Sequence, residues 1–114
     1  NNHLKVNRLN LYSAVDRVST ISNEKSPSIK FKLLKDLINL STVNNENSTA
    51  TEDLDANYNG KNIEIGFNSK YVMDIINNLE DDNIFINLKD NSSPITISEK
   101  SKPNLIYVLM PMRV

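Results

Sequence analysis

The chain ends in the stretch that decides how the rest is interpreted, Tyr107-Val108-Leu109-Met110-Pro111-Met112-Arg113-Val114. Its first four residues are apolar and include a β-branched residue and an aromatic one, which indicates a strand. Pro111 has no backbone N–H, so the strand must stop there or continue as an edge. Methionine is an adaptable contact residue often found where peptides bind. The ending is therefore either a core strand with a short apolar overhang or a docking surface for a partner peptide.

Length and composition indicate a single domain covering residues 1–114. The 13 basic and 14 acidic residues nearly balance, which argues against a domain that grips nucleic acid tightly. The chain has no cysteine, so disulfides and thiolate metal sites are excluded. No apolar run approaches membrane-spanning length and no signal peptide opens the sequence, so we expect a cytoplasmic protein.

The first half of the chain predicts one strand, one helix and three further strands. The alternation of Leu4–Arg8 predicts the first strand, and Asn10 is the predicted N-cap of the helix. The helix is predicted from an apolar stripe at helical spacing, formed by Leu11, Ala14, Val15, Val18 and Ile21. Pro27 then predicts a break, followed by strands at Ile29–Leu33 and Leu37–Thr42 around a turn at Lys35-Asp36. The polar stretch at Asn44–Asp53 is too poor in apolar residues to belong to a core. A weaker strand is predicted at Leu54–Tyr58 and a turn at Asn59-Gly60.

The second half repeats this order. Its predicted elements are a strand at Asn62–Gly66, a helix marked by Val72, Ile75, Ile76 and Leu79, and strands at Ile84–Leu88, Pro94–Ser98 and Leu105–Met110. Tyr12 and Tyr71 are predicted at matching helix positions. The repeated order predicts an internally duplicated α+β domain, with two helices packed side by side on two antiparallel sheets.

Residues suited to catalysis are scarce. His3 is the single histidine and is predicted to be solvated near the amino terminus. The run Glu80-Asp81-Asp82 is more typical of a solvated turn than of a metal site. Gly60 and Gly66 are the only glycines, so no glycine-rich phosphate loop exists. We therefore expect no enzyme activity and no cofactor.

Three segments of the chain resemble one protein family. Tyr107–Val114 is similar to a family ending in Met-Pro-Met-Arg-Leu, and Arg17–Lys25 and Ile63–Asp74 resemble two further family segments, in the family's order and spacing. The family is the bacterial DNA sliding clamp, the β subunit of DNA polymerase III. The resemblance covers most of this chain but only the last third of a clamp subunit, its C-terminal domain.

The resemblance implies a non-catalytic processivity factor. A clamp forms a ring that encircles and slides on duplex DNA without sequence preference, with helices lining the hole and sheets forming the outer wall. It implies a homodimer for the full-length protein and, because ring closure needs the first domain of a neighbour, a monomer or only weak self-association for this chain. Three basic residues would face the DNA, namely Arg8, Arg17 and Lys70.

The resemblance also implies a groove that binds polymerase and clamp-loader subunits through short peptides of the Gln-Leu-x-Leu-Phe type. Met and Pro would form an adaptable apolar floor, and Tyr71 and Asn68 a rim able to form hydrogen bonds. The matching positions are Asn68, Tyr71, Ser92, Pro94, Val108, Met110, Pro111, Met112, Arg113 and Val114.

A third implied surface closes the ring against the first domain of a neighbouring subunit. It maps to Thr20, Ile21 and the segment from Glu46 to Glu52. Family members are richly acidic there, whereas this chain has Ser48, Thr49 and Thr51, so we expect fewer ion pairs and more weight on Ile21. Ser26-Pro27-Ser28 also departs from the family's usual Arg-Gly. The alternative function is a stand-alone β-rich scaffold that oligomerises through its edge strands.

Overall fold

The computed structural model describes residues 1–21, 27–43 and 48–112. This part of the chain forms nine strands and two helices. The order of one strand, one helix and then several strands occurs twice. They are β1 (Asn2–Asn7), α1 (Arg8–Ser19), β2 (Ser28–Leu34), β3 (Leu37–Val43), β4 (Thr49–Asp55), β5 (Asn57–Tyr58), β6 (Ile63–Asn68), α2 (Ser69–Asn77), β7 (Asn83–Leu88), β8 (Ile95–Ser98) and β9 (Ile106–Leu109).

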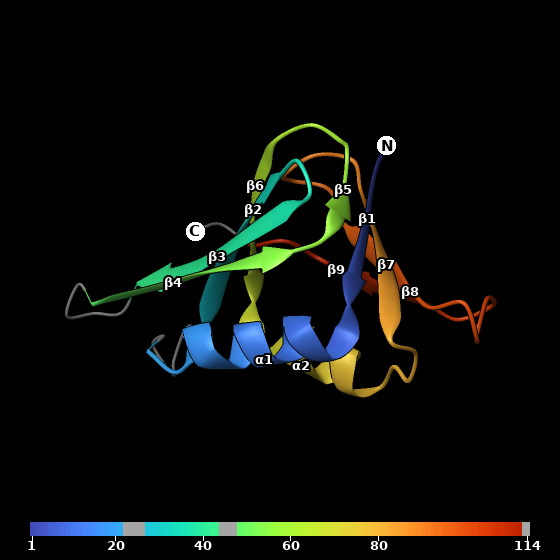
Figure 1. The fold of residues 1–114 in the computed structure, drawn as a ribbon, viewed down its shortest axis with the longest axis horizontal. Helices are drawn as coiled ribbons and strands as arrows, with labels where there is room; N and C mark the ends of the chain where they lie inside the picture. The colour runs from blue at the N-terminus through green and yellow to red at the C-terminus, as the bar shows by residue number, and fades with distance from the viewer. Residues whose placement is uncertain (22–26, 44–47, 113–114) are drawn as a thin grey trace.

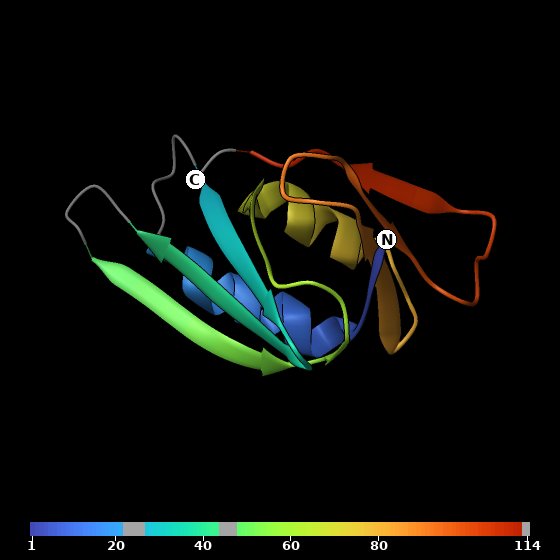
Figure 2. The same ribbon diagram turned by 90° about the horizontal axis from the view of Figure 1, so that it is seen from above.

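The strands form two antiparallel sheets. One has the order β5-β1-β7-β8-β9 and the other the order β4-β3-β2-β6. Both helices lie below the sheets in Figure 1, and the perpendicular view in Figure 2 shows them side by side. The predicted α+β architecture, with two helices on two antiparallel sheets, is confirmed. Neither helix in the described ranges is long and apolar enough to cross a membrane.

The two halves of the chain exchange their first strands. Strand β1 pairs with β7 of the second half, with Val6 opposite Ile84, and β6 pairs with β2 of the first half, with Phe67 opposite Ile29. Each sheet therefore contains strands from both halves (Figure 2). Neither half can complete its sheet alone.

The apolar stripes of both helices face a shared core. Leu11, Ala14, Val15 and Val18 of α1 are buried as predicted, and so are Val72, Ile76 and Leu79 in and after α2. Ile21 follows the end of α1 and is only half-buried. In the sheets, the rings of Phe31 and Phe67 meet edge to face with centroids 5.4 Å apart.

The start of the first helix was predicted incorrectly. Asn7 is the N-cap of α1, and its side-chain oxygen accepts a hydrogen bond from the Asn10 N–H at 2.9 Å. Asn10 is therefore the third residue of the helix, and Arg8, predicted in the strand, opens it. Asn68 caps α2 in the same way. Tyr71 is consequently the equivalent of Asn10, and the predicted match between Tyr12 and Tyr71 is wrong.

The two asparagines provide a direct test of this cap. Replacing Asn7 with alanine should lower the free energy of unfolding by about 1 kcal/mol, because the helix loses its capping acceptor. Replacing the exposed Asn10 with alanine removes no cap and should change stability by less than about 0.5 kcal/mol. Urea denaturation of both variants measures the difference. Equal losses would contradict the assignment of Asn7.

The predicted strand Leu54–Tyr58 is also wrong, because the chain changes sheet at Ala56. Strand β4 begins at Thr49, inside the predicted polar stretch, and is an edge strand with alternating exposure that needs few apolar residues. Strand β5 then joins the other sheet, where Tyr58 lies opposite Leu4. The turn at Lys35-Asp36 is confirmed, and Asp36 has a positive φ of 54°.

Candidate peptide-binding groove and neighbouring surfaces

The end of the chain crosses from one sheet to the other. Strand β9 stops at Leu109, one residue before its predicted end, and Pro111 follows outside any strand. The N–H of Met112 then donates to the carbonyl of Gly66 at 2.8 Å, which forms a single bridge with β6. The chain is held at both ends of this crossing, so Met110 and Pro111 span the space between the sheets.

An apolar groove lies between α2 and this crossing. Its volume is about 540 Å³. Three large apolar residues of the groove are exposed to solvent, Tyr71 at 60%, Val108 at 62% and Met110 at 62%. The full lining is Asn68, Tyr71, Asp74, Ile75, Val108, Leu109, Met110 and Met112. Exposed apolar side chains gathered in a concave surface are typical of a binding site.

The predicted groove residues fall into four sets. Those brought together in the groove are Asn68, Tyr71, Val108, Met110 and Met112. Ser92 and Pro111 instead line an adjoining polar hollow of about 630 Å³, to which Met112 also contributes. Pro94 is exposed and lines neither space. Arg113 and Val114 lie outside the described residues.

Three lining residues were missed in the sequence. Asp74 and Ile75 follow Tyr71 by three and four positions on α2, so the helical period places them on the face that carries Tyr71. That spacing was a usable signal. Leu109 is 94% buried under the groove, and its sequence context predicts only a strand residue.

Local hydrogen bonds fix two parts of this region. The Asn68 side-chain oxygen accepts from the N–H groups of Lys70 and Tyr71 at 3.0 and 3.3 Å, so its amide NH₂ is the group suited to a ligand. In the loop beside the polar hollow, the Asp90 carboxylate accepts from the N–H groups of Ser92 and Ser93 at 2.9 and 2.8 Å. These bonds, led by the Ser92 N–H, lower the pKa of Asp90 to about 2.

The internal repeat supplies a second copy of the same backbone arrangement. After β4, Asn57 pairs with Lys5 of β1, just as Met112 pairs with Gly66 of β6 after β9. The strand pairings agree with this correspondence, because Asp53 faces Asn39 in the first half as Val108 faces Thr96 in the second. The two crossings are therefore equivalent.

The side chains at the equivalent positions differ in polarity. Tyr71, Val108, Met110 and Met112 of the groove correspond to Asn10, Asp53, Asp55 and Asn57. The backbone alone therefore does not make an apolar groove. The second half of the chain carries apolar side chains where the first half carries polar ones, and this difference marks the groove as a specialised surface.

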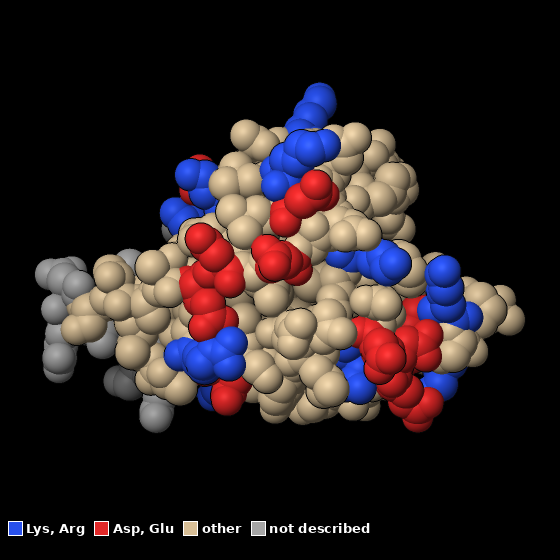
Figure 3. Space-filling view, in the orientation of Figure 1, with Lys and Arg blue, Asp and Glu red and all other residues tan. Residues whose placement is uncertain are grey.

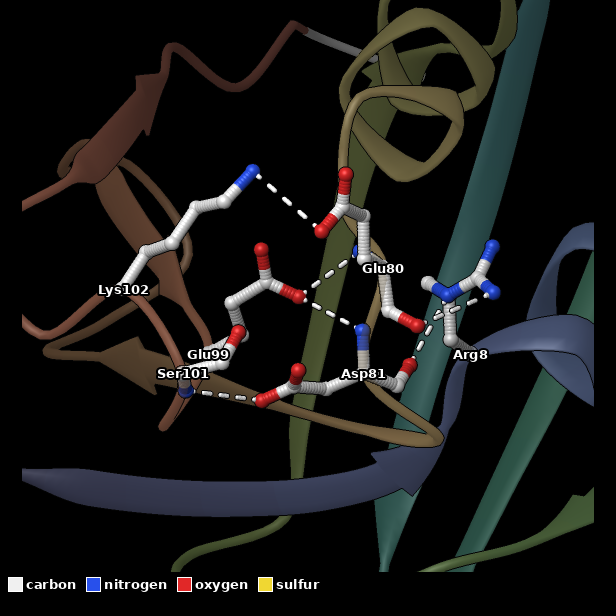
Figure 4. Close-up of polar contacts among 6 residues, drawn as sticks. All are labelled: Arg8, Glu80, Asp81, Glu99, Ser101 and Lys102. Atoms are coloured by element: carbon white, nitrogen blue, oxygen red, sulfur yellow. Dashed lines mark hydrogen bonds and ion pairs between the residues drawn. The ribbon is translucent and has the colours of Figure 1, made fainter.

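Arg8, predicted to face DNA, is held by the loop that follows α2 (Figure 4). Its Nε donates to the carbonyl of Asp81 at 2.8 Å and its Nη2 to the carbonyl of Glu80 at 3.4 Å. The guanidinium therefore has a structural role, and within the described ranges no carboxylate oxygen lies within 4 Å of it.

The same loop is anchored by a buried carboxylate. Glu99 is 3% exposed, and its Oε1 accepts from the N–H groups of Glu80 and Asp81 at 2.8 and 2.7 Å (Figure 4). Its Oε2 has no hydrogen-bond partner among the described residues. The Asp81 carboxylate in turn accepts from the Ser101 N–H at 2.9 Å, and hydrogen bonds from Ser101 lower the pKa of Asp81. The predicted solvated acidic turn is thus tied to the β8–β9 connection.

The other predicted basic residues differ in their surroundings. Arg17 of α1 forms two hydrogen bonds with Glu52 of β4, at 2.7 and 2.8 Å. Lys70 is exposed near the start of α2. On the face shown in Figure 3, basic and acidic side chains lie in small mixed groups and form no continuous basic surface.

The predicted ring-closing residues lie near this ion pair. Thr20 is exposed at the end of α1, and its hydroxyl donates to the carbonyl of Arg17 at 2.8 Å. Ile21 is half-buried, and Glu52 lies on the edge strand β4. Glu46 lies outside the described residues. The helix end and the strand edge therefore adjoin through Arg17 and Glu52.

Comparison with known proteins gives one family. Residues 1–113 match the model of the DNA polymerase III β subunit, C-terminal domain. The β sliding clamp of Caulobacter vibrioides is 39% identical over 101 residues, which are 89% of this chain and 27% of that protein. The clamp of Escherichia coli K12 is 33% identical over 112 residues, or 98% of this chain and 31% of that protein. The chain thus spans about a third of these relatives or less.

Solved structures agree with the sequence match. A sliding clamp from Bartonella birtlesii bound to griselimycin superimposes with a TM-score of 0.96 at 38% identity, covering all of this chain and 31% of that one. The Pseudomonas aeruginosa clamp gives 0.97 at 32% identity, covering all of this chain and 32% of that one. The chain therefore belongs to the β sliding clamp family, the non-catalytic accessory subunits of DNA polymerase III, and matches the C-terminal domain of that subunit.

Proposed function

We propose that this chain is the last domain of a clamp subunit and acts as a processivity factor, tethering polymerase and clamp-loader subunits to DNA through short peptides. The observation that carries the proposal is the exposed apolar groove between α2 and the end of β9. Within the cytoplasm, the complete ring would encircle duplex DNA while this groove holds a partner.

The groove suits a peptide with leucine and phenylalanine anchors. Val108, Met110 and Met112 offer apolar contacts that adapt to either side chain. Each anchor that is fully buried contributes roughly 1.5–3 kcal/mol. Tyr71 and the Asn68 amide lie where they can orient the peptide by hydrogen bonds. The predicted residues Pro94, Arg113 and Val114 remain part of the proposal, since a bound peptide can extend beyond the groove.

The isolated domain should bind such a peptide weakly. In the family the groove lies between the middle and last domains, and this chain spans only 27–31% of its curated relatives. Residues 1–114 tested alone would bind without the contacts that a preceding domain supplies in the family, and we expect a Kd on the order of 100 μM or weaker.

A titration of isotope-labelled protein with a Gln-Leu-Ser-Leu-Phe peptide, followed by NMR, tests the groove. The matched pair is Val108→Ser and Ile106→Ser, because both residues are exposed on β9, at 62% and 57%, but only Val108 lines the groove. Val108→Ser should weaken binding about tenfold through the lost apolar contact. Ile106→Ser should leave the Kd unchanged.

The location of the peptide-induced shifts is the second readout. Shifts at Tyr71, Ile75 and Met110–Met112 are expected, and griselimycin, which the Bartonella relative binds, should shift the same residues. Equal weakening by both β9 variants, or no shifts at millimolar peptide, would contradict the proposal.

We further propose that Lys70, Arg17 and Arg8 face the DNA in the complete ring, and that Thr20, Ile21, Glu46 and Glu52 belong to the surface that closes it. The near balance of 13 basic and 14 acidic residues fits weak, sliding contact with phosphates better than tight binding. Without the first domain of a neighbour, this chain should be a monomer or associate only weakly. The scaffold alternative rests on the exposed apolar edge strand β9, and it predicts stable self-association without peptide binding.

A further inference from the structure

The ion pair between Arg17 and Glu52 joins two surfaces that were predicted to act separately. Arg17 projects from α1, one of the two helices proposed to face DNA, and Glu52 lies on β4, the edge strand proposed to close the ring. Nε of Arg17 donates to Oε1 of Glu52 at 2.7 Å, and Nη2 donates to Oε2 at 2.8 Å. Both oxygens of the carboxylate are therefore used by one guanidinium.

The bonds to Glu52 occupy two N–H donors of the Arg17 guanidinium, Nε and Nη2, which could otherwise bind a phosphate. A guanidinium binds a carboxylate or a phosphate through two parallel N–H donors, and here one such pair is taken. The hydrogen bond raises the pKa of Arg17 and lowers that of Glu52, so both stay ionised at neutral pH. The Arg17 side chain is nevertheless 62% exposed, so it can exchange partners.

Arg8 and Lys70, the other two residues proposed to face DNA, lack such a counter-ion among their described contacts. Arg8 bonds to backbone carbonyls, which carry no net charge, and Lys70 is exposed with no ion pair within 4 Å among the described residues. Arg17 is therefore the one of the three whose charge is compensated by a carboxylate within the described part of the domain.

We propose that Glu52 is an internal counter-ion that competes with DNA phosphate for Arg17. This inference rests on the proposed function, in which α1 faces DNA. A cation that engages Glu52 at the β4 edge, such as a basic side chain of a neighbouring subunit, would release Arg17 toward DNA. Because coupling between two binding events is reciprocal, phosphate binding at Arg17 would in turn free Glu52 for that cation. Ring closure and DNA contact are then linked through one pair of side chains.

The test compares two variants that remove the same charge. Glu52→Gln deletes the carboxylate bonded to Arg17, whereas Asp16→Asn deletes an exposed carboxylate on α1 that acts on Arg17 only through space. Each labelled protein is titrated by NMR with a short DNA duplex at several salt concentrations. Glu52→Gln should raise the apparent affinity for the duplex about threefold to fivefold. It should also make the decrease of log affinity with log salt concentration steeper, by the amount expected for about one more phosphate contact. Asp16→Asn should change both much less.

A double variant separates release of Arg17 from a general change in charge. Arg17→Gln combined with Glu52→Gln should lose the higher affinity for the duplex that Glu52→Gln gives alone. The DNA-induced shifts at Lys70 should remain. The counter-ion role alone would be overturned if DNA shifts Lys70 as in the wild type but Glu52→Gln and Asp16→Asn raise the apparent affinity equally. It would also be overturned if DNA shifts Lys70 but neither variant raises the affinity. The absence of duplex-induced shifts on both helices in every protein would overturn the proposed DNA contact and this inference with it.

Discussion

Replacing Glu99 with alanine is expected to lower the free energy of unfolding by about 3 kcal/mol, because two backbone N–H groups lose their buried carboxylate acceptor. Those donors belong to Glu80 and Asp81, and Glu99 itself is 97% buried. The loop carries the carbonyls that hold Arg8 at the start of α1, so the loss should spread to both helices. Urea denaturation gives the energy, and amide exchange gives its distribution.

Two further variants isolate the contribution of the Glu99 acceptor. Glu99→Gln keeps an oxygen in place and should lose only about 1 kcal/mol. Lys102→Ala removes the exposed Lys102–Glu80 pair at 3.6 Å and should be close to neutral. An alanine variant of Glu99 as stable as the Lys102 variant would contradict the anchoring role.

Replacing Phe67 with alanine should have a still larger effect, roughly 3–5 kcal/mol, through lost apolar burial and the cavity left behind. The ring is 1% exposed and packs edge to face against Phe31 at a centroid distance of 5.4 Å. Phe67 also lies on β6, one of the two exchanged strands, so the cavity would open where both halves meet. Thermal unfolding should show a decrease in Tm on the order of 15 °C.

Phe85→Ala is the matched control, since it makes the same chemical change on β7. Phe85 is only half-buried, with the Lys100 ammonium 5.7 Å from its ring centroid. Its replacement should cost about 1–2 kcal/mol. A loss at Phe85 equal to or larger than the loss at Phe67 would contradict the assigned core.

Most elements of the fold were predictable because their signals are local. The alternation of Ile29–Leu33, the helical spacing from Leu11 to Val18, and the break at Pro111 each act within a few residues. The groove was partly predictable for the same reason, since the family ending and the Asn68–Tyr71 spacing lie in short segments. The N-cap of α1 was misplaced because Asn7 and Asn10 are both suitable caps, and only the hydrogen bond from the Asn10 N–H distinguishes them.

The sequence by itself determined the order of strands and helices, the internal repeat, and the apolar character of the chain end. Tertiary structure alone decided that β1 and β6 exchange sheets, that Met112 pairs with Gly66, and that Glu99 is buried while Arg17 meets Glu52. The physical reason is distance along the chain. Periodicity, caps and turns depend on neighbouring residues, whereas these pairings join positions 18 to 86 residues apart in hydrogen bonds and strand contacts that form only when both halves pack on one core.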